Sequence, residues 1–161
     1  MCKFYIKFGW LSVLHTFATT QKMPTFGAMN SSLYIHIPFC KKLCGYCDFF
    51  KTMSLAKKSE VLDAIAREMR ERASVLEGTV LKTIYFGGGT PTVCSPDELG
   101  ALLVCARDVF DCSEVEEVTV EANPDDLSEE YLAGLQEWGI NRLSIGIQSF
   151  RDEDLMMMNR R

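Results

Sequence analysis

Hydrophobic residues along the chain follow two repeats, a short one typical of strands and a longer one typical of helices. Apolar stretches at residues 33–37, 80–86, 116–121 and 141–148 are separated by segments whose apolar residues recur every three or four positions. Such alternation predicts parallel strands joined by crossover helices, because each helix must return the chain to the same edge of the sheet. From residue 33 onward the sequence therefore predicts an α/β fold of four parallel βα units.

The segments between these strands carry specific helix signals. Ser95-Pro-Asp-Glu98 is a capping box with proline at the first helical position, and Ser128 and Gly139 mark the start and end of a shorter helix. Residues 152–161 have the composition of a further helix. The first helix is predicted to bury one face, which is made of Leu62, Ile65, Met69, Ala73 and Leu76.

The first 28 residues differ from the rest. Two lysines precede the apolar run 8–14, which mimics a secretory signal, but no small-residue cleavage site follows and the run is too short to span a bilayer. Met29 stands four residues before the first predicted strand. We expect residues 1–28 to be a disordered extension or an over-called start, and residues 29–161 to hold the domain.

Composition narrows the function classes. With 161 residues, 47% hydrophobic and 24% charged, the chain has an ordinary soluble composition for one modest domain. The net charge of −5 is unevenly spread, since residues 1–58 hold eight lysines and one acid. No basic stripe with interleaved aromatic residues is present, so we expect no nucleic-acid partner. Seven cysteines, an odd number with three clustered, predict a reducing compartment and hence the cytoplasm.

The three clustered cysteines, Cys40, Cys44 and Cys47, are spaced four and then three residues apart. Two metal centres fit this spacing. A structural zinc ion would need a fourth ligand, which His36 or Asp48 could supply. An iron–sulfur cluster held by three thiolates would instead leave one iron open to a substrate. The spacing alone leaves both interpretations open.

Further candidate residues follow the other predicted strands. Three glycines, 87–89, end the second strand, Glu121 ends the third and Gln148 ends the fourth. Because the carboxyl ends of parallel strands meet at one edge, we expect these residues to share a site with the cysteines. The glycines would let backbone approach a ligand, although a tight turn would use them equally well. A phosphate loop is disfavoured, because neither of its glycine signatures is present.

Together these motifs resemble a known family. Tyr34-Ile-His-Ile-Pro-Phe-Cys40, Gly87-Gly-Gly-Thr-Pro-Thr92 and Asn141-Arg-Leu-Ser-Ile-Gly-Ile-Gln-Ser-Phe150 are similar to the radical S-adenosylmethionine (radical SAM) superfamily. Within it they resemble the branch of oxygen-independent coproporphyrinogen III oxidase (HemN) and the heme chaperone HemW. The resemblance covers nearly all of residues 32–161. It implies a partial, TIM-like radical SAM barrel, with four parallel βα units present, the C-terminal units missing, and residues 29–161 as a truncated core domain.

The resemblance also implies the site and its cofactors. These are a [4Fe–4S] cluster, S-adenosylmethionine (SAM) on its open iron, and possibly heme in the full-length family member. The cluster ligands would be Cys40, Cys44 and Cys47. The SAM contacts would be Tyr34, Tyr46, Gly88, Gly89, Thr90, Glu121, Gln148 and Arg160.

Within the branch, the oxidase carries a further cysteine two places after the third ligand, where this chain has Phe49. This difference favours the HemW-type chaperone over the oxidase, and leaves open whether the chain is an enzyme. The implied partners are heme or a porphyrinogen, a heme-recipient protein, and an acidic electron donor such as a flavodoxin, which Lys41 and Lys42 would attract. The alternatives are the oxidase itself, a zinc-binding module and a non-functional truncated remnant.

Overall fold

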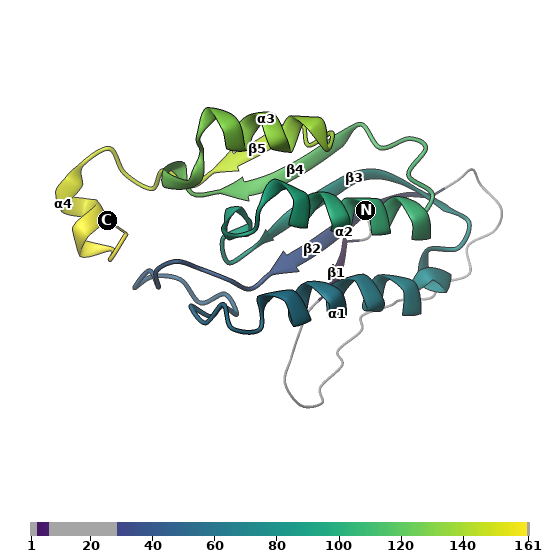
Figure 1. Cartoon of the computed structure of the whole chain (residues 1–161), viewed down its shortest axis with the longest axis horizontal. Helices are drawn as coiled ribbons and strands as arrows, with labels where there is room; N and C mark the ends of the chain where they lie inside the picture. The colour runs from purple at the N-terminus through teal and green to yellow at the C-terminus, as the bar shows by residue number, and fades with distance from the viewer. Residues whose placement is uncertain (1–2, 7–28, 161) are drawn as a thin grey trace.

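A computed structural model describes residues 3–6 and 29–160, which form a parallel sheet with helices on one side (Figure 1). Spatial order follows chain order, β1-β2-β3-β4-β5, and all neighbouring strands are parallel. The strands are β1 (Lys3–Ile6), β2 (Met29–Ile37), β3 (Thr79–Gly88), β4 (Glu117–Ala122) and β5 (Arg142–Ile145). The predicted α/β fold with four parallel βα units is therefore confirmed in β2 to β5.

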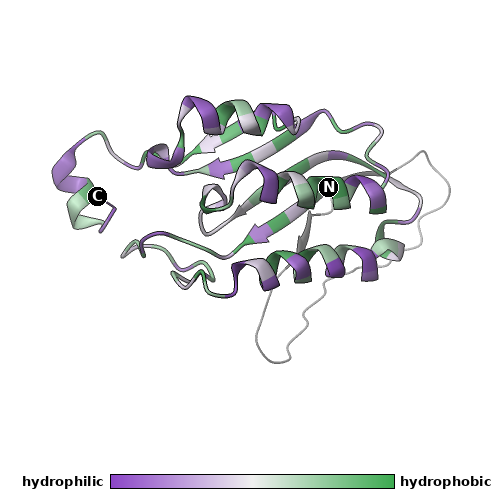
Figure 2. Cartoon of the chain, in the orientation of Figure 1, coloured by the Kyte–Doolittle hydropathy of each residue, from purple (hydrophilic) through white to green (hydrophobic). Residues whose placement is uncertain are grey.

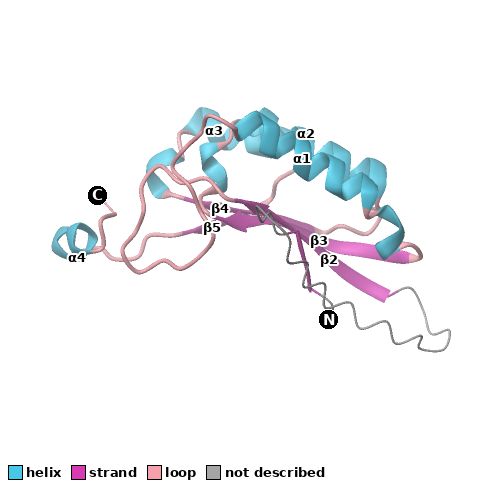
Figure 3. Ribbon diagram, turned by 90° about the horizontal axis from the view of Figure 1, so that it is seen from below, coloured by secondary structure: helices cyan, strands magenta, loops and turns pink. Residues whose placement is uncertain are grey.

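Three helices cover a single face of this sheet (Figure 3). They are α1 (Lys58–Glu71), α2 (Pro96–Val109) and α3 (Glu129–Glu137), and a short fourth helix, α4 (Asp152–Met157), lies beyond the carboxyl ends of the strands. Single 3₁₀ turns occur at η1 (Ala73–Leu76), η2 (Pro91–Val93) and η3 (Pro124–Asp126). One-sided coverage follows from the right-handed crossovers that join parallel strands.

The strands bury one face and leave the other polar. In β2, Leu33, Ile35 and Ile37 are buried, whereas Tyr34 and His36 alternate with them and stay partly accessible. Figure 2 shows mainly hydrophobic colours along the strands and hydrophilic colours on the arrowheads of β2 and β4. The core between sheet and helices is thus apolar, and polar side chains accumulate where the strands end.

The helix boundaries follow the predicted signals. Ser95 Oγ accepts a hydrogen bond from the Glu98 N–H at 3.2 Å, and Glu98 Oε2 accepts one from the Ser95 N–H at 2.8 Å, which completes the predicted capping box. Ser128 caps α3 by a single hydrogen bond, which its Oγ accepts from the Tyr131 N–H at 3.1 Å. None of the helices in the described part of the chain has the length and apolar character needed to cross a bilayer.

Several details differ from the sequence pattern. Strand β2 begins at Met29 rather than at residue 33, and α1 ends at Glu71, so Ala73 and Leu76 of the predicted helix face lie in η1. Strand β5 ends at Ile145 rather than at residue 148, because the chain turns there and Gln148 adopts a positive φ of 68°. Helix α4 ends at Met157, ahead of Asn159 with a φ of 55°. The pattern does not predict β1, whose four residues pair with β2. Residues 1–2 and 7–28 lie outside the described residues, so the predicted extension stays a prediction there.

Candidate functional site

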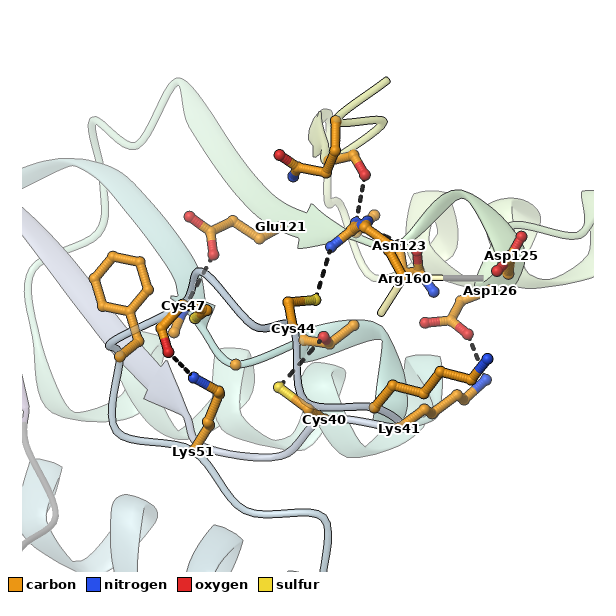
Figure 4. A pocket seen from close by; sticks show the side chains of 18 of the residues that line it. Cys40, Lys41, Cys44, Cys47, Lys51, Glu121, Asn123, Asp125, Asp126 and Arg160 are labelled. Atoms are coloured by element: carbon orange, nitrogen blue, oxygen red, sulfur yellow. Dashed lines mark hydrogen bonds and ion pairs between the residues drawn. The ribbon is translucent and has the colours of Figure 1, made fainter. Parts of the chain in front are cut away.

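The loops that follow β2, β3, β4 and β5 enclose one cavity of about 380 Å³ at the carboxyl edge of the sheet (Figure 4). Every predicted site residue except Tyr34 lines it: Cys40, Cys44, Cys47, Tyr46, Gly88, Gly89, Thr90, Glu121, Gln148 and Arg160. Tyr34 lies on the uncovered face of the sheet, where its ring stacks on Tyr85 with centroids 5.8 Å apart. The expectation that the four strand ends share a site therefore agrees with the geometry.

The three cysteines lie on the segment 38–52, which we call the cysteine loop. Its two ends are joined, because the Thr52 N–H donates to the Pro38 carbonyl at 2.7 Å and the Cys40 N–H donates to the Thr52 carbonyl at 3.0 Å. Cys40 is buried, and Cys44 and Cys47 are half-buried. All three are free thiols. A closed loop of this kind presents its sulfurs to the cavity without large movement of the backbone.

The environment of Cys40 affects its ionisation. Burial raises the pKa of the Cys40 thiol, and a contact from the Thr90 hydroxyl, with Oγ1 3.7 Å from Sγ, acts in the opposite direction. A thiol must lose its proton to ligate a metal. A nearby charge that stabilises the Cys40 thiolate would therefore favour metal binding by this residue.

The arrangement distinguishes between the two metal centres that the spacing allows. Among residues 29–160, no group of three or more histidine, cysteine or acidic side chains surrounds a single point closely enough to hold one metal ion. Zinc needs its thiolates about 2.3 Å away, whereas a [4Fe–4S] cluster attaches each thiolate to a different iron. Three thiols around one wide cavity leave room for such a cluster.

The residues that could complete a zinc site also lie elsewhere. Neither His36 nor Asp48 lines the cavity. The His36 ring nitrogens lie 3.4 Å from the Tyr34 hydroxyl and 3.0 Å from the Phe50 carbonyl oxygen, so both are occupied by the chain itself. Neither of the two residues that the sequence offers as a fourth zinc ligand therefore lies beside the three thiols.

The glycines after β3 are required by contacts within the chain. A Cβ on Gly88 would lie 2.5 Å from the His36 ring, and Gly88 has a φ of 115°. A Cβ on Gly89 would lie 2.5 Å from the Phe39 carbonyl oxygen and 3.0 Å from Cys40 Sγ. These glycines thus let β3 approach β2 and the cysteine loop closely. Contact of the same backbone with a ligand stays a prediction.

Glu121 is oriented by two donors. Its Oε1 accepts a hydrogen bond from the Tyr85 hydroxyl at 2.8 Å, and its Oε2 accepts one from the Gly88 N–H at 3.1 Å. Burial raises the pKa of Tyr85, and the hydrogen bond to Glu121 raises it further, so the phenol remains a donor. Sequence reasoning missed Tyr85, although its alternation within β3 could have placed it on the same face as Glu121.

Arg160 reaches the cavity from beyond α4. Its guanidinium lies within hydrogen-bonding distance of four groups: Cys44 Sγ at 3.7 Å, the Tyr46 hydroxyl at 3.4 Å, Asn123 Oδ1 at 3.4 Å and the Gly146 carbonyl oxygen. The segment carrying it is attached to the cysteine loop, because the Gly45 N–H donates to the Met158 carbonyl at 3.2 Å. Arg160 therefore connects the loops after β2, β4 and β5.

An ion pair between an exposed lysine and a buried aspartate links the cysteine loop to the loop after β4. Asp126, whose side chain is 2% exposed, accepts from Lys41 Nζ through Oδ1 and from the Thr92 hydroxyl through Oδ2 at 2.7 Å (Figure 4). Sequence reasoning missed Asp126, because no local pattern indicates its partner. The Lys41 charge is therefore compensated inside the chain, while Lys42 is exposed.

Known proteins are similar to this chain in sequence. The family model described as the radical SAM superfamily matches residues 34–161. The heme chaperone HemW of Bacillus subtilis (strain 168) is 45% identical over 131 residues, which cover 80% of this chain and 35% of that protein. The oxygen-independent coproporphyrinogen III oxidase of Escherichia coli (strain K12) is 36% identical over 131 residues, which cover 80% of this chain and 29% of that protein.

A solved structure agrees with the fold. The structure titled as coproporphyrinogen III oxidase (HemN) from Escherichia coli, a radical SAM enzyme, matches with a TM-score of 0.73 and 35% identity, covering 81% of this chain and 30% of that one. The chain thus spans about a third of the length of these relatives. The family model covers most of this sequence, and the three clustered cysteines of this chain line one cavity. The chain therefore belongs to the radical SAM superfamily.

Proposed function

We propose that this chain is the radical SAM part of a HemW-type heme chaperone, holding a [4Fe–4S] cluster on Cys40, Cys44 and Cys47 with SAM beside it. The observation that carries the proposal is the convergence of three thiols from one loop, with no fourth cysteine beside them among the described residues, on one cavity. Membership of the superfamily implies both cofactors. When bound, this cofactor pair supplies a carbon-centred radical by one-electron reduction of SAM.

The residues around the thiols have chemistry that suits SAM. The Arg160 guanidinium is a donor for a carboxylate, and the Glu121 carboxylate is an acceptor for an ammonium or ribose hydroxyls. Tyr46 offers an aromatic ring that is half exposed at the cavity. Gly88, Gly89, Thr90 and Gln148 line the same cavity and are proposed as further contacts. Tyr34 is proposed to act from the adjoining sheet face, beneath the cavity.

Two observations favour the chaperone over the oxidase. Identity to the HemW of Bacillus subtilis is 45%, against 36% to the Escherichia coli oxidase. Phe49, 68% exposed at the cavity, occupies the place where the oxidase pattern has an extra cysteine. Heme or a porphyrinogen, and a protein that receives heme, are proposed as partners of the whole protein. His36, the histidine within residues 29–160, is hydrogen-bonded and is not proposed as a heme ligand.

An acidic electron donor such as a flavodoxin is proposed to bind beside the cysteine loop. Lys42 is exposed there, whereas Lys41 is paired with Asp126, so Lys42 carries the accessible charge. The cytoplasm is the proposed location, because free cysteines and an oxygen-sensitive cluster suit a reducing compartment.

Anaerobic loading with iron and sulfide tests the proposal. We expect acid-labile sulfide bound to the chain, and an EPR signal of the reduced cluster that changes when SAM is added. The matched control is Cys94→Ala, which removes a buried thiol outside the cavity and should leave loading intact. Bound zinc without labile sulfide would refute the proposal, and decarboxylation of a porphyrinogen would favour the oxidase.

A further inference from the structure

Lys51 is a charged residue of the cavity to which sequence reasoning assigned no role. Its side chain is half-buried and lines the cavity together with the three cysteines. Its Nζ donates a hydrogen bond to the carbonyl oxygen of Cys47. Figure 4 shows the ammonium group pointing toward Cys47 from the far end of the cysteine loop. The positive charge therefore lies at the cavity that the three thiols line, beside the backbone of Cys47.

The backbone holds Lys51 in this place. The next residue, Thr52, forms a parallel bridge with Phe39, donates to the Pro38 carbonyl and accepts from the Cys40 N–H. These contacts attach the chain beside Lys51 directly to the chain before the first cysteine. The position of the ammonium relative to the loop is thus set by main-chain hydrogen bonds, unlike that of a lysine on an open surface.

The charge of Lys51 has no acidic partner in the described part of the chain. Lys41, Lys58 and Lys82 each form an ion pair with a carboxylate, whereas no carboxylate lies within 4.0 Å of Lys51 Nζ there. Removing a cation from water without a counter-charge is unfavourable. A negative group bound in the cavity would balance this charge, and three metal-bound thiolates would provide one.

We propose that Lys51 is the counter-charge of the thiolate-bound cluster, a positioning residue that stabilises its reduced state. The inference rests on the proposed function. On reduction the cluster gains one electron from a low-potential donor and therefore one negative charge, with no bond formed or broken. A nearby fixed positive charge favours that state, because cluster potentials depend on local charge and on hydrogen bonds around the ligands.

Three variants of the full chain, loaded anaerobically with iron and sulfide, separate charge from shape. Lys51→Gln keeps a hydrogen-bond donor without the charge, Lys51→Arg keeps the charge, and Arg67→Gln removes an exposed charge of helix α1 as a control. The readout is the midpoint potential from an EPR-monitored redox titration, together with bound iron and labile sulfide. These readouts need neither substrate nor turnover.

We expect Lys51→Gln to reduce the equilibrium constant for cluster reduction about tenfold, a shift of about 59 mV to more negative potential for a one-electron couple. Lys51→Arg and Arg67→Gln should retain the parent potential. Loss of loading in Lys51→Gln alone would equally support a requirement for the charge. A parent-like potential in Lys51→Gln, or loss of loading in both Lys51 variants, would overturn the inference. If the parent chain binds no labile sulfide, both this inference and the proposed function fail.

Discussion

Replacing Lys41 by methionine should destabilise the fold, because it leaves the Asp126 carboxylate buried without its cation. The Asp126 side chain is 2% exposed and that of Lys41 is 59% exposed, so only the acid depends on its partner for compensation. Breaking a fully buried pair costs about 3–5 kcal/mol. The Thr92 hydroxyl still donates to Asp126 here, and Lys41 itself is partly solvated. We therefore expect a loss of about 2–3 kcal/mol.

A double-mutant cycle tests the origin of this loss. Asp126→Asn should cost only about 1 kcal/mol, because a neutral amide can still accept from Thr92. In the double variant, the two single effects should fail to add by about 1–2 kcal/mol. The assay is urea unfolding of the metal-free protein followed by circular dichroism, with Lys42→Met as the control for an exposed charge on the same loop. Additive effects within about 0.5 kcal/mol would refute the reasoning.

Three other variants or reagents examine separate parts of the structure. Gly100→Ala should lower stability by about 1–3 kcal/mol in the same unfolding assay, because its Cβ would lie 2.1 Å from the Trp138 ring on the facing helix. Gly89→Ala should abolish iron and sulfide loading, since its Cβ would lie 3.0 Å from the sulfur of the first loop cysteine. Gly45→Ala, with nothing within 4 Å, should load normally, and equal loading of the two would contradict this. Burial raises the pKa of the Cys94 thiol to about 12. At pH 9, iodoacetamide should therefore label the half-buried thiols of the cysteine loop before it labels Cys94, which mass spectrometry of the labelled peptides can measure. The unfolded thiol ionises near its ordinary pKa, so stability should decline as pH rises from about 9 toward 12 and be insensitive to this group below that range.

Local sequence signals were sufficient to predict the strands β2 to β5, the helices between them and the placement of three cysteines on one loop. Helix α2 begins at Ser95 because its capping box involves residues three apart, and β2 buries alternate residues because strand geometry has a period of two. The three cysteines are also a local feature, since their spacing places them on one loop. Such patterns act within a few residues and can be read directly from the chain.

The sequence predicted that the strand ends share one edge of the sheet, but it did not predict which side chains contact each other within the site. Arg160 meets Cys44 only because α4 folds back onto the cysteine loop, more than a hundred positions away in the chain. Tyr85 meets Glu121 only through the register of β3 with β4, and Lys41 meets Asp126 only where the loops after β2 and β4 approach.

The sequence by itself thus determined the order of the βα units and the placement of three thiols on one loop, because periodicity and residue spacing are local properties. The tertiary structure alone decided which charges line the cavity beside those thiols, Lys51 and Arg160 among them, and which charge is compensated by a carboxylate, namely Lys41. The physical reason is that electrostatic interactions depend on distance in space, and crossover packing rather than sequence separation sets that distance.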